Sequence, residues 1–574
     1  MTKKITTTII IFFINFISFA QHAPFTIYIE PTTIKGLGGL QSFAFGQYNG
    51  TWLLLGGRLD GLHRKQPFAA FDRPGANKQL MVIDPVKKQK WAVPLVSLPK
   101  SIREQLSSSN MQFFQQGDYL YCVGGYGYSA TADEHITYGK LTAIKISAVI
   151  KAIVKGTRFT AFFRQITDTA FAVTGGKLLK INDTYHLVGG QKFTGRYNPI
   201  GPNHGPGFEQ QYTNAIRRFT LSDNGTAITI NNLPAYNDSV NLHRRDNNVV
   251  PQIMPNGAEG FTSFSGVFQQ SADLPFLTCV NVDSIGYSVG SSFQQYYNHY
   301  HCANMPLYAA SANQMHNIFF GGIAQYYDSL GTLVQDNNVP FTKTISRVTR
   351  NANGEMAEYK LPVKMPTLLG AGSEFIPASN IPQYANNVFK LDDFNADSTL
   401  VGYIYGGIKS SAKNIFWINE GEESRASSRI FKVYVIKNKA GSKDQLNEQS
   451  TGTLQMQVTT NPDEGDFIVK FNLIKKVPVR LLLFNAKGGI VGDNTNGSKQ
   501  NVVGEEHQPR WNIVGDNINN SGNDGKIENK ILDNVMVGEN IYQRKIPHLD
   551  KGGAFMLTIE TPNEKATQKI IVAP

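Results

Sequence analysis

The sequence predicts an all-β protein, with a six-bladed β-propeller followed by a small Ig-like β-sandwich. Three observations favour this fold class. Charged residues make up only 17% of the chain, whereas glycine (53 residues) and aromatic residues (11%) are plentiful, which suits sheets better than helical bundles. Short apolar strands that end in a glycine pair recur along residues 21–437. A polar stretch then leads into a C-terminal segment with alternating strand patterns.

Residues 1–20 have the pattern of an export signal. Two lysines precede an apolar run from Ile9 to Ala20, and Ser18 and Ala20 place small residues before a cleavage point at Gln21. The run is too short to span a bilayer comfortably. We therefore expect export through the Sec system, removal of this segment, and no transmembrane segment in the mature chain.

A repeat organises the body of the chain. Glycine pairs follow short apolar strands about every 70 residues between Gly57 and Gly407. Glycine lets a crowded inner strand approach its neighbour and turn sharply. A four-stranded sheet cannot bury both faces alone, so six such units are expected to pack around a ring. The marks are Gly56-Gly57, Gly124-Gly125, Gly189-Gly190, Ser265-Gly266, Gly321-Gly322 and Gly406-Gly407.

The first repeat carries a further pattern. The strand Leu80–Ile83 is followed by the turn Asp84-Pro85 and by Trp91, which would pack between sheets. This arrangement resembles the kelch repeat, and the resemblance implies a kelch-like propeller. Later repeats keep the strand and lose the tryptophan; their strands are 141–146, 215–221, 276–282, 342–348 and 430–436. The repeat exceeds the ~50 residues usual for kelch, so the excess is assigned to loops at 58–78, 191–212, 283–305 and 408–428.

A ring of sheets must close where its ends meet. Phe25–Ile29 is an isolated strand that precedes the first glycine pair. We expect it to complete the last sheet by pairing beside Ile430–Ile436.

Charge and cysteine content exclude several classes of protein. The net charge is +11, but the basic clusters are short, so no nucleic-acid partner is expected. An exported domain that depends on disulfides would carry more than three cysteines. We predict buried free thiols at Cys122, Cys279 and Cys302, with one bridge as the alternative.

The C-terminal part has its own organisation. Residues 438–452 form a polar linker, and residues 453–574 form a second domain. An insert near 492–540 is rich in Asn, Gly and Asp and is expected to be a loop. The predicted strands of the sandwich are 454–458, 467–471, 477–484, 555–559 and 569–572.

This domain resembles the type A sorting domain of the type IX secretion system of Bacteroidetes. The match rests on an opening turn, a middle strand (479–484) with its Gly-Gly turn, a Leu-x-x-Gly hairpin (549–553) and a closing strand at the terminus. The resemblance implies the type IX machinery as a partner, and release or attachment at the outer-membrane surface. The residues that carry the predicted signal are Asn461, Pro462, Gly465, Gly552, Gly553 and Lys569.

Ser291–Cys302 is the most unusual stretch of the body. If it is extended, Tyr297, His299 and His301 share one face. Two histidines so spaced can bind Zn or Cu, with a third ligand from His243, His316 or Glu259. A polar pocket wall without metal and ordinary hydrogen-bonded residues are the alternatives.

A second cluster is His243-Arg244-Arg245-Asp246. Arginine pairs bind carboxylates and sulfates in forked geometry. The alternative is a solvated loop in which Asp246 neutralises one arginine. A propeller brings loops from all blades to one channel mouth, so this cluster, the stretch above and His316 could form one ligand site. Aromatic, arginine and amide side chains together suit sugars.

Asp393, Asn395 and Asp397 have the alternating oxygen spacing of a calcium loop. The sixth position is Ser398 and the twelfth is Ile404, where an EF-hand has Gly and Glu. Calcium is therefore one possible ligand, and a polar turn without metal is the alternative. No other cofactor is indicated.

The leading functional hypothesis is a secreted or cell-surface protein that binds glycans or proteins without catalysis. No nucleophile elbow, metalloprotease motif or phosphate loop occurs in the sequence. The first alternative is a carbohydrate-active enzyme, epimerase- or lyase-like, that uses His243, Arg244, His299 and His301. The second alternative is a structural component of the cell surface.

Overall fold

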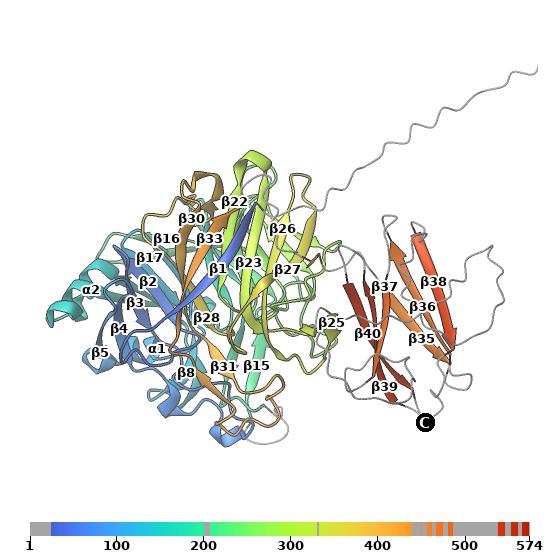
Figure 1. Cartoon of the computed structure of the whole chain (residues 1–574). Coiled ribbons are helices and arrows are strands. Elements are labelled where there is room, and N and C mark those ends of the chain that lie inside the picture. Colours follow the sequence, from blue (N-terminus) through green and yellow to red (C-terminus); the bar gives the residue numbers. More distant parts are fainter. Residues whose placement is uncertain are drawn as a thin grey trace, which may run out of the picture.

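The computed structural model of the chain describes residues 24–199, 207–329 and 332–438, together with strands of the C-terminal region (Figure 1). The predicted export signal and most of the predicted linker lie outside the described residues. The fold is all-β, as predicted. The described residues also hold two α-helices, α1 (Lys100–Leu106) and α2 (Ile146–Lys155), which the repeat pattern did not predict.

Six antiparallel sheets with four main strands each follow one another along the body. We number them sheet 1 to sheet 6. Sheet 1 contains β2 (Ala44–Tyr48), β3 (Thr51–Leu55), β4 (Gln79–Asp84) and β5 (Gln89–Pro94). Sheet 2 contains β6 (Gln112–Gln116), β7 (Tyr119–Val123), β10 (Lys140–Lys145) and β11 (Phe163–Thr167). Sheet 3 contains β12 (Lys177–Ile181), β13 (Thr184–Val188), β16 (Ala215–Asp223) and β17 (Ile228–Asn237).

The remaining three sheets repeat this order of strands. Sheet 4 contains β18 (Asn248–Ile253), β19 (Glu259–Phe264), β20 (Cys279–Val282) and β21 (Tyr287–Gly290). Sheet 5 contains β22 (Asn304–Ala309), β23 (Gln314–Ile323), β26 (Phe341–Arg350) and β27 (Met356–Lys364), extended by β29 (Phe389–Lys390) and β34 (Gln449–Ser450). Sheet 6 contains β28 (Ser373–Pro377), β30 (Ser398–Gly406), β33 (Ile430–Lys437) and β1 (Phe25–Thr32).

Sheet 6 joins the two ends of the body. Strand β1 pairs antiparallel with β33, from Phe25 opposite Lys437 to Thr32 opposite Ile430. Phe25 and Ile27 are buried in the core that sheets 5 and 6 share. The predicted closure by the N-terminal strand is therefore confirmed, with three further residues in the strand.

The glycine pairs link each sheet to the next. In all six marks both residues have positive φ, including Ser265 in the variant pair. A Cβ on Gly124 would lie 1.9 Å from the Val173 carbonyl oxygen, so only glycine allows this approach. The second residue of each pair donates its N–H to the following sheet: Gly57 to Ser108, Gly125 to Val173, Gly190 to Arg244, Gly266 to His299, Gly322 to Leu369 and Gly407 to Leu40. The last of these bonds returns from sheet 6 to sheet 1.

A ring of six backbone hydrogen bonds lies just before the first strands of the sheets. Each sheet contributes one residue, whose N–H donates to the carbonyl of the residue from the preceding sheet. The bonds are Asn110 to Ser42 (3.0 Å), Gly175 to Asn110 (3.2 Å), Asp246 to Gly175 (2.6 Å), His301 to Asp246 (2.6 Å), Gly372 to His301 (2.9 Å) and Ser42 to Gly372 (2.8 Å). We call these six residues the floor ring. Five of them have positive φ, and His301 does not.

Apolar side chains fill the space between neighbouring sheets. Trp91, the tryptophan of the first repeat, packs against the core between sheets 1 and 2, as predicted. Helix α2 adds to the same core through Val149, Ile150 and Ile153. The helix begins at Ile146, where the predicted strand was expected to end. Cys122, Cys279 and Cys302 are buried free thiols, as predicted.

The connections within the sheets form further strands, partly in sequence that we assigned to loops. Connections of sheets 2 and 3 build one additional sheet from β8 (Tyr126–Ser129), β9 (Glu134–Thr137), β14 (Gln191–Thr194) and β15 (Glu209–Tyr212), of which β14 and β15 lie in the assigned loop 191–212. Connections of sheets 5 and 6 form two separate hairpins, β24 (Tyr326–Ser329) with β25 (Thr332–Gln335) and β31 (Ile408–Ser410) with β32 (Ser424–Ala426). The assigned loop 283–305 includes β21 and the start of β22. These extra strands give the long connections a fixed shape.

The C-terminal region contains two three-stranded antiparallel sheets. One is β35 (Met456–Asn461), β36 (Asp466–Leu473) and β38 (Gly538–Lys545); the other is β37 (Arg480–Asn485), β39 (Gly553–Glu560) and β40 (Lys565–Val572). The five predicted strands are present with shifted ends. Strand β38 is new, and its first residues fall within the predicted insert. Of the predicted sorting residues, Asn461, Gly553 and Lys569 lie in strands, whereas Pro462, Gly465 and Gly552 lie outside the described residues.

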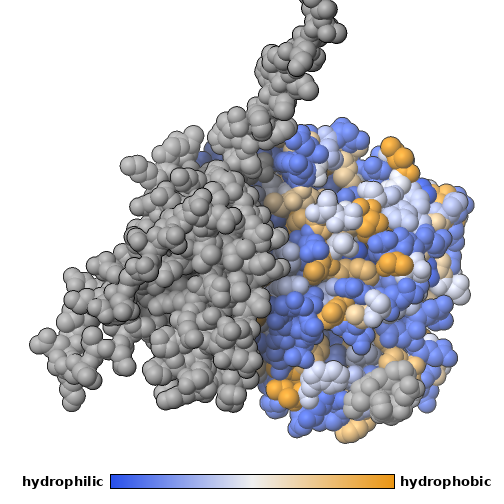
Figure 2. All heavy atoms as spheres, turned by 90° about the vertical axis from the view of Figure 1, so that its right-hand side faces the viewer, coloured by the Kyte–Doolittle hydropathy of each residue, from blue (hydrophilic) through white to orange (hydrophobic). Residues whose placement is uncertain are grey.

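The surface of the described body is mixed. In Figure 2 its visible part is largely hydrophilic, with hydrophobic residues in small separate groups. In the described part of the chain, every helix is too short or too polar to cross a membrane.

Candidate functional site

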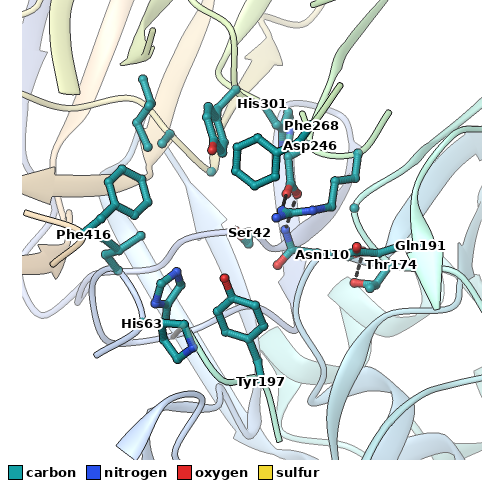
Figure 3. A pocket seen from close by; sticks show the side chains of 18 of the residues that line it. Ser42, His63, Asn110, Thr174, Gln191, Tyr197, Asp246, Phe268, His301 and Phe416 are labelled. Atoms are coloured by element: carbon teal, nitrogen blue, oxygen red, sulfur yellow. Dashed lines mark hydrogen bonds and ion pairs between the residues drawn. The ribbon is translucent and has the colours of Figure 1, made fainter. Parts of the chain in front are cut away.

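A cavity of about 700 Å³ lies at the centre of the six sheets. Every sheet contributes residues to its lining, through the floor ring and through the long connections. The connections that the sequence assigned to loops all reach it. Figure 3 shows His63, Tyr197, Phe268 and Phe416 directed toward one central space above Ser42. The cavity is therefore the place where distant parts of the chain meet.

The floor ring lies along the inner wall of this cavity. All six of its members line the large cavity, and all but Gly372 also line a second cavity of about 20 Å³. The second cavity is too small to hold a sugar ring. The floor ring therefore marks a limit of the space that a ligand can fill.

Arg245 and Asp246 form the charged part of the cavity wall. The Arg245 guanidinium pairs with the Asp246 carboxylate, lies 5.1 Å from the Phe268 ring centroid, and donates through Nε to the Tyr212 hydroxyl at 3.2 Å. Burial alone would lower the pKa of Arg245, but the nearby Tyr212 and Asp246 raise it above its ordinary value. Asp246 also accepts a bond from Asn110 Nδ2 at 3.3 Å. The pair is therefore held in place in the cavity wall.

His63 projects into the cavity from the connection within sheet 1. Its ring packs against Tyr197 (4.9 Å between centroids) and lies 6.2 Å from Phe71. Burial lowers the pKa of His63 to about 4, helped by the positive charges of Arg245 and Arg58. Nδ1 is buried without a hydrogen-bond partner. His63 is thus a neutral imidazole in the cavity wall, with one ring nitrogen that makes no hydrogen bond.

His301 connects the cavity to charges below the floor. Its Nε2 lies 3.0 Å from Glu374 Oε1, and Lys177 Nζ lies 3.7 Å from Glu374 Oε2. Burial alone would raise the pKa of Glu374, but Lys177 and His301 outweigh that effect and lower it. A carboxylate buried this deeply needs such partners. His301 is the floor residue with contacts on both sides.

The rest of the lining is aromatic and amide-rich. The additional sheet supplies Gln191, whose Oε1 accepts a bond from Gln210 Nε2 at 2.6 Å. His243 stacks on Tyr212, with centroids 3.8 Å apart. The other aromatic and amide residues of the lining include Gln41, Phe71, Tyr126, Phe193, Tyr197, Asn198, Phe208, Phe268, Gln269, Gln270, Tyr300, Asn337, Asn338, Phe416 and Trp417. Aromatic faces beside hydrogen-bonding groups suit a ligand with both apolar and hydroxyl-bearing faces.

Three of the seven predicted ligand residues line this cavity: His243, Arg245 and His301. Arg244 does not, although it neighbours two of them. It is 1% exposed and donates to the carbonyls of Asn241 (2.6 Å), Ser265 (2.8 Å) and Thr278 (2.7 Å). Burial lowers its pKa to about 9. The structure therefore places Arg244, predicted as a ligand residue, among backbone carbonyls and outside the cavity lining.

His299 and Tyr297 are also buried away from the cavity. The His299 Nδ1 accepts the Gln325 N–H at 3.0 Å, so Nε2 carries the proton and donates to the Gln295 carbonyl at 2.8 Å. The stretch is not a strand, and Asn298 has a φ of 60°, which breaks the predicted alternation. As a result Tyr300 and His301 both reach the cavity, whereas His299 has no free nitrogen for a metal.

His316 lies inside sheet 5 rather than in the cavity. Its Nδ1 is 2.9 Å from the Thr349 hydroxyl, and its ring packs edge-on against Phe25. Glu259 begins β19, also away from the cavity. In the residues that the structure describes, no three His, Cys, Asp or Glu side chains are grouped so as to hold a metal. Both His299 nitrogens are engaged within the protein, so the structure gives no support to the predicted Zn or Cu site on His299 and His301.

Asp393, Asn395 and Asp397 are exposed where a short 3-10 turn (Leu391–Asp393) leads into β30. The side chain of the neighbouring Asp392 accepts the Ser311 N–H at 2.8 Å. The arrangement is that of a polar turn, the alternative to a calcium loop, and these residues lie apart from the cavity lining.

The sequence alone missed His63, Tyr212, Trp417 and most of the floor ring. One feature of the sequence could have identified part of the floor ring. Ser42, Asn110 and Gly175 stand at the same distance before the first glycine of a pair, so the first three repeats mark the floor positions. His63 had no such mark, because its connection differs in length from its counterparts.

Comparison with known proteins finds matches among solved structures only. No family model and no curated protein matches the chain. The matching solved structures include one described as "Structure of YjhT", which aligns with 71% of this chain and 99% of its own at 11% identity, with a TM-score of 0.36.

Proposed function

We propose that this chain is an exported, six-bladed kelch-like β-propeller that binds a glycan in its central cavity. The six successive sheets, the return of β1 to sheet 6 and the circular hydrogen bonds of the floor ring support the propeller. The first-repeat strand, turn and Trp91 support the kelch assignment. The export signal and the sorting-domain resemblance support secretion or attachment at the cell surface.

The composition of the cavity carries the glycan proposal. A sugar presents apolar C–H faces, which stack on aromatic rings, and hydroxyls, which bind amides and guanidinium groups. The cavity joins Tyr212, Phe268 and Tyr197 with Arg245 and Gln191 in one enclosed space. Buried polar groups of this kind favour a ligand that satisfies them over a purely apolar one.

A glycan array with the full-length chain tests this function. We expect a defined set of bound sugars, and we expect binding to persist in a chelator, because the described cavity residues form no metal-binding group. A blank array would contradict the glycan proposal and direct attention to protein ligands. Loss of binding in chelator would contradict the metal-free site.

A second candidate function is a carbohydrate-active enzyme on the same site. The observation that favours it is His63, a cavity-lining imidazole whose pKa burial lowers to about 4 and whose buried Nδ1 has no hydrogen-bond partner. Such a group can accept a proton from a sugar carbon or hydroxyl. For a catalyst, His63→Ala should lower kcat far more than it raises KM for a sugar from the array. For a binding protein, no sugar would be converted by either form.

The sorting domain is tested by localisation. We expect a chain that lacks residues 453–574 to lose its export signal normally and then to accumulate in the periplasm. Protease resistance of the accumulated body would show that it has folded. Unchanged delivery to the cell surface would contradict the assignment of residues 453–574 as a type IX sorting domain.

A further inference from the structure

Trp417 is an exposed aromatic residue on the open side of the cavity. It lines the cavity, yet 67% of its surface is accessible to solvent. It lies in the connection between β31 and β32 of sheet 6. A large aromatic residue left this exposed contributes little to the core, so its position calls for another explanation.

The backbone on both sides of Trp417 is fixed. Ile415 and Asn419 are fully buried, and the Asn419 N–H donates to the Ile415 carbonyl at 2.8 Å. The Asn419 side chain donates to the carbonyls of Leu62 (2.8 Å) and His63 (2.9 Å), and its own carbonyl accepts the Lys65 N–H at 2.8 Å. The indole is therefore presented on a braced turn, and little conformational freedom remains to be lost when something stacks on it.

The surroundings of Trp417 favour a small neutral partner. The charges beside it are paired, with Lys65 Nζ 2.7 Å from Glu420 Oε1. Trp417 and its neighbour Ile418 (52% exposed) are the large exposed hydrophobic residues of this connection. Two residues cover far less than the roughly 800 Å² per partner of a stable protein interface. A single sugar ring, in contrast, matches the face of one indole.

We propose that the ligand is an oligosaccharide bound end-on, with its terminal unit in the cavity and the next unit stacked on Trp417. This inference rests on the proposed glycan-binding function. Beyond the floor ring the structure shows only a cavity of about 20 Å³, which cannot hold a sugar ring, so an oligosaccharide that fills the large cavity with one end must extend past the rim. Trp417 is the rim residue that both lines the cavity and is largely exposed to solvent.

The experiment measures affinity against chain length by calorimetry with the full-length protein. The probes are glucose, galactose, mannose and N-acetylglucosamine, each with its own linear oligomers of two to six units. We expect affinity to rise roughly tenfold from one unit to two or three and then to stay constant. We also expect the tryptophan emission to shift to shorter wavelength with the oligomers and less so with the monosaccharide.

Three variants identify the rim residue. Trp417→Ala should abolish the gain with length and the emission shift, and weaken the binding of oligomers far more than that of the monosaccharide. Trp417→Phe should retain most of the gain. Tyr28→Ala removes another exposed aromatic residue (50% exposed, on β1) outside the cavity lining, and should change nothing.

The contrary outcomes are distinct. If the wild type binds monosaccharides and oligomers equally, or if affinity continues to rise through six units, end-on binding is wrong and the glycan function stands. If Trp417→Ala weakens all probes equally, the residue supports the cavity instead of a rim subsite. If Trp417→Ala leaves the affinity for every sugar unchanged and weakens the binding of a protein ligand, the rim binds protein. If the wild type binds no sugar, the proposed function fails, and this inference fails with it.

Discussion

Arg244 and Arg245 show how neighbours in sequence take different roles. Arg244 is buried among backbone carbonyls, and its guanidinium lies 4.0 Å from the Phe276 ring centroid. Arg245 faces the cavity beside Asp246. One residue ties together the segment before sheet 4, and the other presents a fixed fork to a ligand. The same substitution at the two positions should therefore have different effects.

We expect Arg244→Lys to destabilise the fold by about 2–3 kcal/mol, because lysine keeps the charge and loses the planar fork that bonds several carbonyls. Arg245→Lys should change the free energy of unfolding by less than about 1 kcal/mol and weaken sugar binding about tenfold, since the ion pair can persist. Chemical denaturation and calorimetry measure the two effects. Equal destabilisation by both variants would contradict the separate roles.

The residue types of the site could be predicted from sequence, but their directions could not. His243, Arg245 and His301 were found because histidine and arginine cluster in two short stretches. His299 and Arg244 belong to the same stretches, yet their side chains satisfy buried carbonyls. The direction of each side chain depends on the positive φ of Asn298 and on the positions of nearby carbonyls. Neither can be predicted from the local sequence.

At the scale of elements, β1 decides whether the ring of sheets closes. It forms the last strand of sheet 6 and buries Phe25 and Ile27 in the core, whereas Tyr28 on the other face is half exposed. The strand is joined to the rest of sheet 6 only by its pairing with β33. Packing of its inner face should therefore control the stability of the closure.

Phe25→Ala should lower the free energy of unfolding by about 3–5 kcal/mol, because it leaves a cavity beside His316. Tyr28→Ala, on the exposed face of the same strand, should have an effect of less than about 1 kcal/mol. Thermal denaturation followed by circular dichroism compares the two. A small effect of Phe25→Ala would mean that β1 is dispensable for closure.

The glycine pairs give a second prediction at this scale. Gly124→Ala should destabilise the body by more than the roughly 1–2 kcal/mol of a left-handed alanine, because its Cβ would meet the Val173 carbonyl at 1.9 Å. Gly117→Ala is the control, since Gly117 also has a positive φ (57°) and has open space around it. Equal losses in the two variants, measured by urea denaturation, would argue against the close contact.

Elements that follow the repeat were predictable, and those that interrupt it were not. The strands before the glycine pairs were placed correctly because apolar runs and glycines mark them. Strands β8, β9, β14 and β15 were missed because they pair with each other across two repeats. Helix α2 was missed because apolar residues continue from the strand at Leu141 to Ile153 with only single polar interruptions, so composition does not separate the strand from the helix.

At the scale of the whole molecule, buried histidines make stability depend on pH. Burial lowers the pKa of His63, His186 and His299 to about 4 each, from an ordinary value of 6.5. Between these values the unfolded chain binds protons that the folded chain does not. The free energy of unfolding therefore falls as the pH falls through this window, by up to about 1.4 kcal/mol per pH unit for each histidine.

One buried carboxyl group acts in the opposite direction. Burial raises the pKa of Glu358 to about 8, so its contribution weakens as the pH rises from 4.5 to 8. Because the histidines outnumber it, we expect the melting temperature to drop between pH 6.5 and pH 4.5. Calorimetry across this range measures the drop, and His299→Gln should reduce it. A melting temperature that rises on acidification would contradict the neutral histidines.

The succession of six sheets and the pairing of the strand at Phe25 with β33 could be predicted from the spacing of the glycine pairs and from the extra N-terminal strand. The floor ring could not, because six single residues, each far from the next in sequence, make the ring. The cavity follows from that ring and from connections whose lengths differ between repeats. The repeat therefore predicts the six sheets, whereas the connections that differ between repeats form the walls of the cavity.

The pairing of β1 with β33 also has a consequence for the order of events in folding. The Thr26 hydroxyl donates to the Asn438 side chain, 412 residues further along the chain. The first strand can therefore pair only after nearly the whole body has been made. Contacts of such separation form late, because a long loop must close first. A chain threaded through a membrane from its N-terminus would carry β1 across unpaired. Sheet 6 would assemble only after residue 437 had followed.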